Sequence, residues 1–313
     1  MTLVSFGETA LRFAPPEGHR FETAREVSLR ADGTASNVAT TASRLGTESV
    51  WLSKLPDTPL GRRVVAELHE HGLETEVVWS DDGDRQGLTF YEDAAPPRED
   101  RLIQDRERVA AATITPGELP MDVIQAADVV FAAGSTAALS DTAAETLGAV
   151  LRATSGARAL DLDFDPGLWD ADTARERLER LFDAVDVLFL NEDEATTVFD
   201  RSGSPRELTH TLASSYDFDY VFLTRSEHGA VAYHDGVVHE RDAIETDIVD
   251  SSGQHDAFVG AVIDRLIAGS ATDEALLYGV AAAALARTMP GPLVPIEAGE
   301  VAALVDRETS GRR

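Results

Sequence analysis

Four short apolar segments in the second half of the chain alternate with helical patterns, and this alternation limits the fold more than any other feature. The segments are Val129 to Ala133, Ala157 to Leu162, Val185 to Leu190 and Val221 to Thr224. Strands separated by helices usually pair in parallel, because the connecting helix crosses one face of the sheet. We therefore predict an α/β fold with a central, mostly parallel sheet, helices on both faces, and binding sites at the carboxyl ends of the strands.

Two segments in the first third of the chain interrupt this pattern. Residues 10–30 alternate polar and apolar side chains around the turn Pro15-Pro16-Glu17-Gly18, and residues 84–109 indicate two further strands. We expect these segments to form a small β-sheet lid. The expected core comprises residues 1–9, 31–83 and 110–305, and residues 306–313 are predicted to be a polar tail.

The composition is strongly acidic, with 56 Asp and Glu residues against 27 Lys and Arg residues and a net charge of -29. Such a surface repels nucleic acid phosphates and anionic membranes, so neither is an expected partner. The imbalance is compatible with a merely acidic protein, but we favour adaptation to concentrated salt, which screens the repulsion between carboxylates. The sequence has no cysteine, which excludes disulfides and thiolate chemistry.

Neither the N-terminus nor the apolar stretches of the chain indicate export or membrane insertion. The N-terminus enters the predicted strand Leu3 to Phe6 without the basic region and long apolar core of a signal peptide. The most apolar long stretch, Ala275 to Ala286, is too short to span a bilayer. We therefore expect a cytoplasmic protein.

The stretch from Asp247 to Phe258 predicts a strand that ends in small residues and a helix that begins at once. Unpaired N–H groups and the positive dipole end of this helix would face an anion near Gly253. Asp256 in the first turn would lie beside that anion, where phosphoryl transfer needs a general base. By itself, however, an Asp in the first turn of a helix is more typical of ordinary capping.

This stretch resembles the C-terminal signature of ribokinase-like (PfkB) carbohydrate kinases, a Gly-Ala-Gly-Asp turn. Gly253 and Asp256 match the signature, whereas Gln254 and His255 depart from it, and His255 replaces the glycine nearest the transferred phosphate. The resemblance implies a ribokinase-like fold with Asp256 as the catalytic base. It also implies that the backbone amides of all four residues stabilise phosphate charge.

A second segment, Ala31 to Ala39, resembles the sugar-binding signature of the same family, a Gly-Gly turn followed by Asn-x-Ala. Gly33 and Asn37 match it. A helix cap is the other interpretation of Asn37, and without the resemblance it would be the preferred one. Side chains of the lid cover the sugar in the resembling enzymes, which suggests Arg108 as a further sugar contact.

A third segment, Leu160 to Trp169, resembles the Asp-x-Asn-x-Arg-Pro-x-Leu-Trp stretch of 2-keto-3-deoxygluconate kinases and fructokinases. Asp161 matches, Asp163 replaces the asparagine, and Asp165 replaces the arginine. The resemblance places Asp161 and Asp165 among the substrate-binding residues. The missing arginine argues against an acidic sugar, because a carboxylate prefers a bidentate cation.

Nucleotide and metal contacts are implied by further resemblances. Asn191 and Glu194 match an Asn-x-x-Glu motif that helps to hold Mg²⁺ through water, although an acidic helix start on a salt-adapted surface is an equal alternative. Thr224, Ser226 and Gly229 resemble a nucleotide-proximal Thr-x-Gly-x-x-Gly turn, with Ser226 in place of the first glycine.

Small side chains around Ala283 would allow a nucleotide base to approach closely, although helix packing is the commoner reason for such residues. The resemblance as a whole implies an ATP- and Mg²⁺-dependent kinase for a hydroxyl of a small sugar or sugar acid. A homodimer formed through the lid is compatible with it. The departures from the signatures support one alternative, a degenerate member that binds sugar or nucleotide without catalysis.

Overall fold

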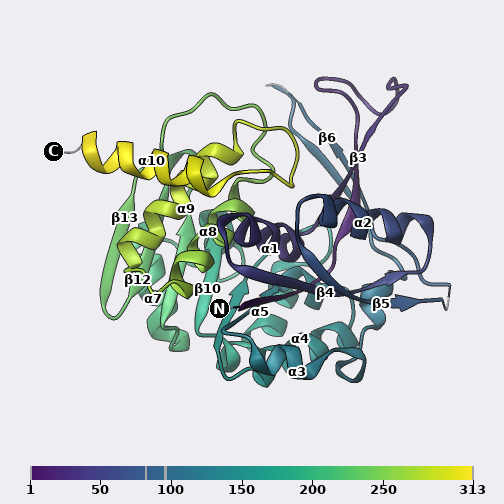
Figure 1. Cartoon of the computed structure of the whole chain (residues 1–313), viewed down its shortest axis with the longest axis horizontal. Helices are drawn as coiled ribbons and strands as arrows, with labels where there is room; N and C mark the ends of the chain where they lie inside the picture. Colours follow the sequence, from purple (N-terminus) through teal and green to yellow (C-terminus); the bar gives the residue numbers. More distant parts are fainter. Residues whose placement is uncertain (1, 82, 95–96, 312–313) are drawn as a thin grey trace.

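The computed structural model of the chain describes residues 2–81, 83–94 and 97–311. A nine-stranded sheet crosses the molecule (Figure 1). Its strands are β1 (Thr2–Phe6), β4 (Glu48–Pro56), β5 (Glu74–Ser80), β8 (Val129–Ala133), β9 (Ala157–Asp161), β10 (Val187–Asn191), β11 (Tyr220–Thr224), β12 (Ala230–His234) and β13 (Val237–Arg241). Their order is β13-β12-β11-β10-β9-β8-β1-β4-β5, and only the β11–β12 and β12–β13 pairs are antiparallel. The predicted mostly parallel α/β sheet is confirmed.

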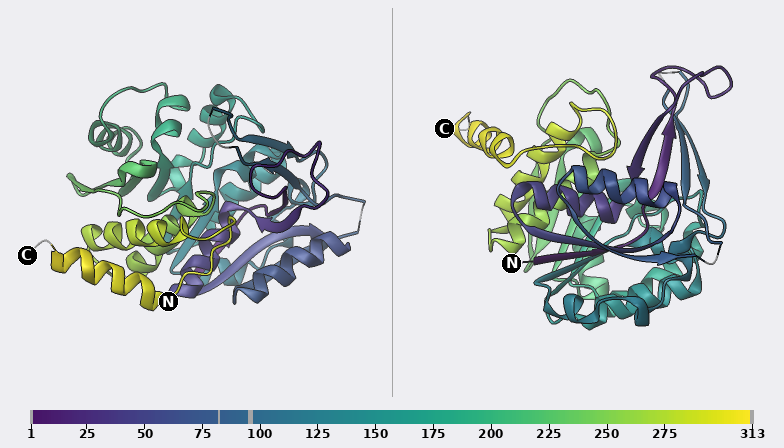
Figure 2. Two further views of the ribbon diagram at one scale, coloured as in Figure 1. Left: turned by 90° about the horizontal axis from the view of Figure 1, so that it is seen from above. Right: turned by 45° about the vertical axis from the view of Figure 1, so that its right-hand side comes forward.

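Helices cover both faces of this sheet (Figure 2). One face carries α1 (Thr34–Leu45), α2 (Pro59–Glu70), α8 (Gln254–Ile267) and α9 (Thr272–Ala286). The other carries α3 (Met121–Ala126), α4 (Asp141–Ala153), α5 (Ala171–Glu179), α6 (Glu192–Thr197) and α7 (Pro205–Tyr216). Successive residues of β1, Leu3 and Val4, pack into opposite layers, which explains why the central strands are apolar throughout. Among the described residues, no helix has the length and apolar character needed to cross a bilayer.

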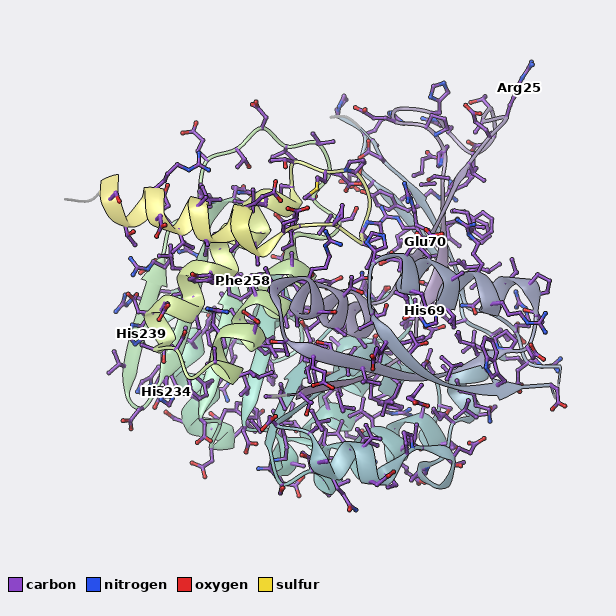
Figure 3. All side chains as sticks on the ribbon, viewed as in Figure 1. Arg25, His69, Glu70, His234, His239 and Phe258 are labelled. Atoms are coloured by element: carbon purple, nitrogen blue, oxygen red, sulfur yellow. The ribbon has the colours of Figure 1, made fainter. Side chains whose placement is uncertain are left out.

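A separate four-stranded sheet projects from the core at one end of the molecule (Figure 2). Its strands are β2 (Ala10–Ala14), β3 (Ser28–Asp32), β6 (Leu88–Glu92) and β7 (Arg101–Asp105), in the order β3-β2-β6-β7. They come from the segments predicted to form the lid. The turn predicted at Pro15 to Gly18 is present, with the N–H of His19 donating to the carbonyl oxygen of Pro16, and it lies within a longer connection of residues 15–27 between β2 and β3. Arg25 lies on this connection and points away from the core (Figure 3).

The strand predicted to end at Asp250 is absent. Ile248 and Val249 are 62% and 61% exposed, and the N–H groups of Val249 and Asp250 donate to the carbonyl oxygen of Arg287. The apolar pair suggested a buried strand, but the large sheet ends at β13 and offers no neighbouring strand on that side. A loop held against the end of α9 therefore precedes α8.

Two other elements were not predicted from the sequence. Strand β5 lies at the sheet edge and alternates exposed glutamates with partly buried residues, so its sequence lacked the continuous apolar run of the central strands. Helix α10 (Ala298–Gly311) includes most of the predicted polar tail, because Val301, Leu304 and Val305 form a buried face upstream of its polar end. Residues 312–313 of that tail lie outside the described residues.

Candidate active site

The first turn of α8 meets the carboxyl ends of three neighbouring strands. Asp161, Asn191 and Thr224 are the last residues of β9, β10 and β11, and His255 at the start of α8 contacts Asp161 and Thr224. Parallel neighbours end at the same edge of a sheet, which is where ligands bind in open α/β folds. The strand order therefore gathers polar groups from distant parts of the chain at one place.

Asp256 is buried in the first turn of α8. Its side chain accepts a hydrogen bond of 2.8 Å from the amide nitrogen of Asn37, whose same nitrogen lies 3.3 Å from Asp32. Burial raises the pKa of Asp256 well above its ordinary value, and the neighbouring charge of His255 and the Asn37 hydrogen bond oppose this rise only in part. The structure thus brings two predicted site residues, Asn37 and Asp256, into direct contact.

The ring of His255 lies between two oxygens of the core. Its Nε2 is 2.7 Å from a carboxylate oxygen of Asp161, and its Nδ1 is 3.0 Å from the hydroxyl oxygen of Thr224. Burial disfavours the charged ring, but the carboxylates of Asp161, Glu194 and Asp256 outweigh burial and raise the pKa of His255 to about 10. The residue that departs from the family glycine therefore lies in surroundings that favour the imidazolium.

Asn191 and Glu194 form a reciprocal cap at the start of α6. The side-chain oxygen of Asn191 accepts from the N–H of Glu194, and Glu194 accepts from the N–H groups of Asn191 and Phe164 at 2.8 and 2.7 Å. Burial and the charge of Asp161 raise the pKa of Glu194 above its ordinary value. Both predicted metal residues thus have a structural role as well.

No group of three or more His, Asp or Glu side chains in the described part of the chain is arranged to hold a metal directly. Each carboxylate oxygen of Glu194 already accepts one backbone N–H. A cation that keeps most of its waters, as Mg²⁺ does, fits such a site, because it needs few direct carboxylate ligands.

A cavity of about 420 Å³ opens beside the start of α8. All four residues predicted to contact the nucleotide line it, namely Thr224, Ser226, Gly229 and Ala283. Asn191, Gln254 and His255 line it as well, so one of the two predicted metal residues and two of the four predicted phosphate residues face the same space. The predicted site residues did not include four other lining residues, Arg225, Phe258, Val280 and Arg287. Phe258 is buried within α8 (Figure 3).

The turn after β11 shows why the family pattern has glycine at two of its positions. Ser226 adopts φ of 47° in place of the expected glycine, a left-handed conformation that glycine adopts with least strain. Gly229 has φ of 90°, and a Cβ there would lie 2.0 Å from the carbonyl oxygen of Arg241. The second glycine of the turn is thus required by both conformation and close packing.

Gly33 and Gly253 are also required by close packing. A Cβ on Gly33 would lie 2.4 Å from the carbonyl oxygen of Glu8, and one on Gly253 would lie 2.6 Å from that of Pro292. Both residues are helix N-caps, of α1 and α8. These glycines let the starts of two helices lie against neighbouring backbone.

The acidic stretch after β9 faces other parts of the site. Asp163 accepts hydrogen bonds from the hydroxyls of Ser135 and Thr34, and its pKa is raised to about 6 by burial and by the charge of Asp161. Asp165 accepts from the side-chain amide of Gln104 on β7. The stretch therefore joins the core to the lid.

Arginines of the lid reach the site, but not the one that was predicted. Arg108 is exposed, and its carbonyl accepts from the N–H of Arg85 in a turn with φ of 56°. Arg106 instead donates to the carboxylate of Glu8 at 2.6 Å and to the carbonyl of Leu88. Both arginines follow the end of β7 at Asp105, where the chain turns, so the alternation of a regular strand no longer sets the direction of their side chains.

Arg12 on β2 is the second inward arginine. Its guanidinium lies 3.9 Å from the centre of the Tyr91 ring, donates to the hydroxyl of Ser252 at 3.0 Å and lies 3.6 Å from Asp32. Sequence reasoning missed it, although a charged residue inside the otherwise apolar strand Ala10–Ala14 is a usable signal. Arg12 connects the lid to the loop that precedes α8.

Comparison with known proteins identifies relatives over nearly the whole chain. The family model of pfkB family carbohydrate kinases matches residues 2–298. A 2-dehydro-3-deoxygalactonokinase of Haloferax volcanii is 46% identical over 302 residues, which cover 96% of this chain and 95% of the relative. A 5-dehydro-2-deoxygluconokinase of Bacillus subtilis is 25% identical over 289 residues, or 90% of this chain and 89% of the relative.

Solved structures share the fold. A 2-dehydro-3-deoxygluconokinase of Thermotoga maritima superposes with a TM-score of 0.91 at 24% identity, covering 98% of both chains. A ribokinase II of E. coli in complex with ATP and Mg²⁺ superposes with a TM-score of 0.87 at 18% identity, covering 98% of this chain and 99% of that one.

Proposed function

The chain belongs to the pfkB family of carbohydrate kinases, and from this premise we propose that it transfers the γ-phosphate of ATP to a hydroxyl of a 2-dehydro-3-deoxy sugar acid. The Haloferax volcanii relative, which is 46% identical over 96% of this chain, acts by its name on 2-dehydro-3-deoxygalactonate. We take this compound as the first candidate substrate. The kinase prediction agrees with the family, whereas the sugar-acid substrate reverses the expectation drawn from Asp165.

The position of Asp256 is the observation that carries the mechanism. Its neighbours Gln254 and His255 line the cavity, and its own carboxylate faces Asn37 and Asp32 on the lid side. A base that lies between a nucleotide and a sugar can take the proton of the attacking hydroxyl. Burial raises the pKa of Asp256, which makes the carboxylate a stronger base than an exposed one.

The start of α8 supports the phosphate role of the signature. The first N–H groups of a helix lack partners within the helix and face the positive end of its dipole. Charge that develops on the transferred phosphoryl oxygens would be stabilised there. A bound Mg²⁺ would supply charge neutralisation for the polyphosphate, with Asn191 and Glu194 holding it through its waters.

Arg12 supports an acidic substrate. Its distance of 3.6 Å to Asp32 is longer than a hydrogen bond, so this pair leaves donor capacity on the guanidinium for a ligand carboxylate. The same guanidinium lies over the ring of Tyr91, and this contact restricts its orientation. An arginine contributed by the lid can thus replace the one that is absent at Asp165.

A substrate panel with the purified protein, ATP and Mg²⁺ tests this proposal. The panel contains 2-dehydro-3-deoxygalactonate, 2-dehydro-3-deoxygluconate, 5-dehydro-2-deoxygluconate, fructose and ribose. We expect the highest kcat/KM for a 2-dehydro-3-deoxy acid. A preference for a neutral sugar would overturn the substrate class, and the absence of phosphorylation with every compound would revive the non-catalytic alternative.

A further inference from the structure

We propose that the pair formed by Asp161 and His255 holds the hydroxyl of Thr224 as a hydrogen-bond donor toward the polyphosphate of the nucleotide. His255 would act through Thr224 and would therefore be a positioning residue. The role does not follow from the family signature, which has a glycine at this position. The inference rests on the proposed function in one respect, since it takes the cavity beside α8 as the nucleotide site.

The geometry orders three side chains in a line that ends at the cavity. Asp161 is 1% exposed and lies 2.7 Å from Nε2 of His255. Nδ1 of the same ring lies 3.0 Å from the oxygen of Thr224. His255 and Thr224 both line the cavity of about 420 Å³, whereas Asp161 lies behind them.

The protonation state of the ring determines what the threonine can do. An imidazolium donates from both nitrogens, so the Thr224 oxygen accepts and its own hydrogen is free to point into the cavity. A neutral ring that donates to Asp161 must accept at Nδ1, and it then takes the threonine hydrogen for itself. Only the charged ring presents Thr224 as a donor to a bound anion.

The surroundings of the ring favour the charged state. Asp161 from β9, Glu194 from α6 and Asp256 from α8 all raise the pKa of His255 by their negative charge. Asp163 is also close enough for its carboxylate to be affected by the ring. These four acids make the imidazolium stable without any bound ligand.

A hydrogen-bond donor at Thr224 would help this acidic cavity to bind a polyphosphate. The cavity is also lined by Glu192, Asp193 and Glu227, which would repel a polyphosphate. A cationic ring and an oriented hydroxyl offset that repulsion, and hydrogen bonds that involve a charged partner are the stronger ones. Adenosine contacts do not depend on these groups, so the effect should be confined to the phosphates.

Calorimetric titration of ATP, ADP and AMP in EDTA tests the proposal without metal or turnover. We expect His255→Gln and Thr224→Val to weaken ATP and ADP binding by roughly 10-fold or more, the scale for loss of a charge-assisted hydrogen bond. AMP binding should change by less than about 2-fold. Thr224→Ser, which keeps the hydroxyl, should bind ATP as the wild type does.

His239→Gln is the matched control. His239 lies on β13 at the far edge of the sheet (Figure 3), with its side chain 28% exposed and 3.9 Å from a carboxylate of Asp273. The side chain of His255 is 26% exposed and also faces a carboxylate. The control removes a similar histidine outside the cavity, and it should leave the binding of all three nucleotides unchanged.

The double variant His255→Gln/Thr224→Val distinguishes action through Thr224 from two separate contributions. If His255 acts through Thr224, the double variant should bind ATP no more weakly than either single variant. Additive losses would overturn the proposal. A gain in ATP affinity in His255→Gln would overturn it too, since the ring would then occupy the place of a phosphate.

The same measurements distinguish the proposed role of His255 from a merely structural one. Equal losses for AMP and ATP, together with a lower melting temperature, would contradict the proposal. If His255→Gln does not fold, two other measurements test the proposal. Thr224→Val should bind ATP more weakly than Thr224→Ser, and the wild type should lose ATP affinity as pH rises. If the wild type phosphorylates no sugar acid but shows the expected binding pattern, the proposed function fails and this inference stands.

Discussion

Five buried or half-buried acidic side chains lie around the start of α8 and its residue His255. These acids are Asp32, Asp161, Asp163, Glu194 and Asp256. Burial is the largest cause of the raised pKa in Asp32, Asp163, Glu194 and Asp256. Burial thus opposes the charged form of these acids, and the charge of His255 favours it in Asp163, Glu194 and Asp256.

Replacing Asp256 by asparagine should separate binding from catalysis. Asp256→Asn keeps the size of the side chain, so ATP binding and the melting temperature should stay close to those of the wild type. We expect kcat on the best sugar acid to fall by roughly 10²-fold or more, the usual effect of losing a general base. Steady-state kinetics and calorimetry measure the two effects. Near-normal turnover would assign the base to another residue.

The pKa of His255 predicts how stability changes with pH. The folded state raises this pKa from 6.5 to about 10, so the ring contributes stability that is fully present below pH 6.5 and is lost as pH rises toward 10. Thermal melts between these pH values should show a falling melting temperature in the wild type.

The variant His255→Gln should lose most of this slope, whereas His239→Gln should keep it. Glu194 has a raised pKa as well, and an acid with a raised pKa also loses stability as pH rises. A residual slope in His255→Gln is therefore expected below pH 8. An identical slope in wild type and His255→Gln would contradict the assignment.

Helix α8 and the lid act as two halves of the site. The start of α8 contains Asp256 and the backbone amides proposed to face the phosphate, and β2 of the lid contains Arg12, which contacts Ser252 just before α8. Ser252 in turn donates to Asp250, whose other carboxylate oxygen accepts from the N–H of Gly291. These hydrogen bonds link the lid, the loop before α8 and the loop after α9, so a substrate that contacts Arg12 also affects the start of α8.

Two arginines of the lid provide a matched comparison. Arg12→Ala should raise KM for the sugar acid by roughly 10-fold or more, because a hydrogen bond to a charged group is worth about 1.5–3 kcal/mol. Its KM for ATP should change little. Arg108→Ala, which removes an exposed guanidinium from the same sheet region, should leave both constants unchanged. A higher KM for the sugar acid in Arg108→Ala, with no change in Arg12→Ala, would assign the sugar contact to Arg108 instead.

The molecule as a whole carries a large excess of negative charge. Its one lysine, Lys54, is 8% exposed and lies 2.8 Å from Glu118, so the exposed cations are mainly arginines. Many of these arginines form surface ion pairs, such as Arg62 with Asp57 and Arg180 with Glu176. Isolated exposed pairs add little stability, and they do not neutralise a net charge of -29.

Salt should therefore stabilise this protein. The screening length for charges is about 3 Å in molar salt and about 30 Å at 0.01 M. Carboxylates therefore repel one another over longer distances in dilute buffer, and the folded state should lose stability there. Circular dichroism and thermal melts from low to molar KCl should show a rising melting temperature. A melting temperature that does not change with KCl would exclude salt adaptation.

Local patterns were sufficient to predict the central strands of the core. Central strands such as β8 are buried on both faces and are apolar throughout, and short-range chemistry marks the ends of elements. Gly46 ends α1 with φ of 116°, and Asp235 and Gly236 form the turn between β12 and β13 with positive φ values. Such signals act within a few residues of the chain, so they are visible in the sequence alone. The resemblance to family signatures added the nucleotide residues that line the cavity.

The contacts between distant segments were decided only by the tertiary structure. His255 meets Asp161 and Thr224, and Arg12 meets Ser252, because the order of strands in each sheet places these segments side by side. No local pattern encodes that order or the direction of a side chain at a strand end. The same limit explains why the strand predicted before α8 is absent, because the large sheet ends at β13 and has no strand beside this loop to pair with it.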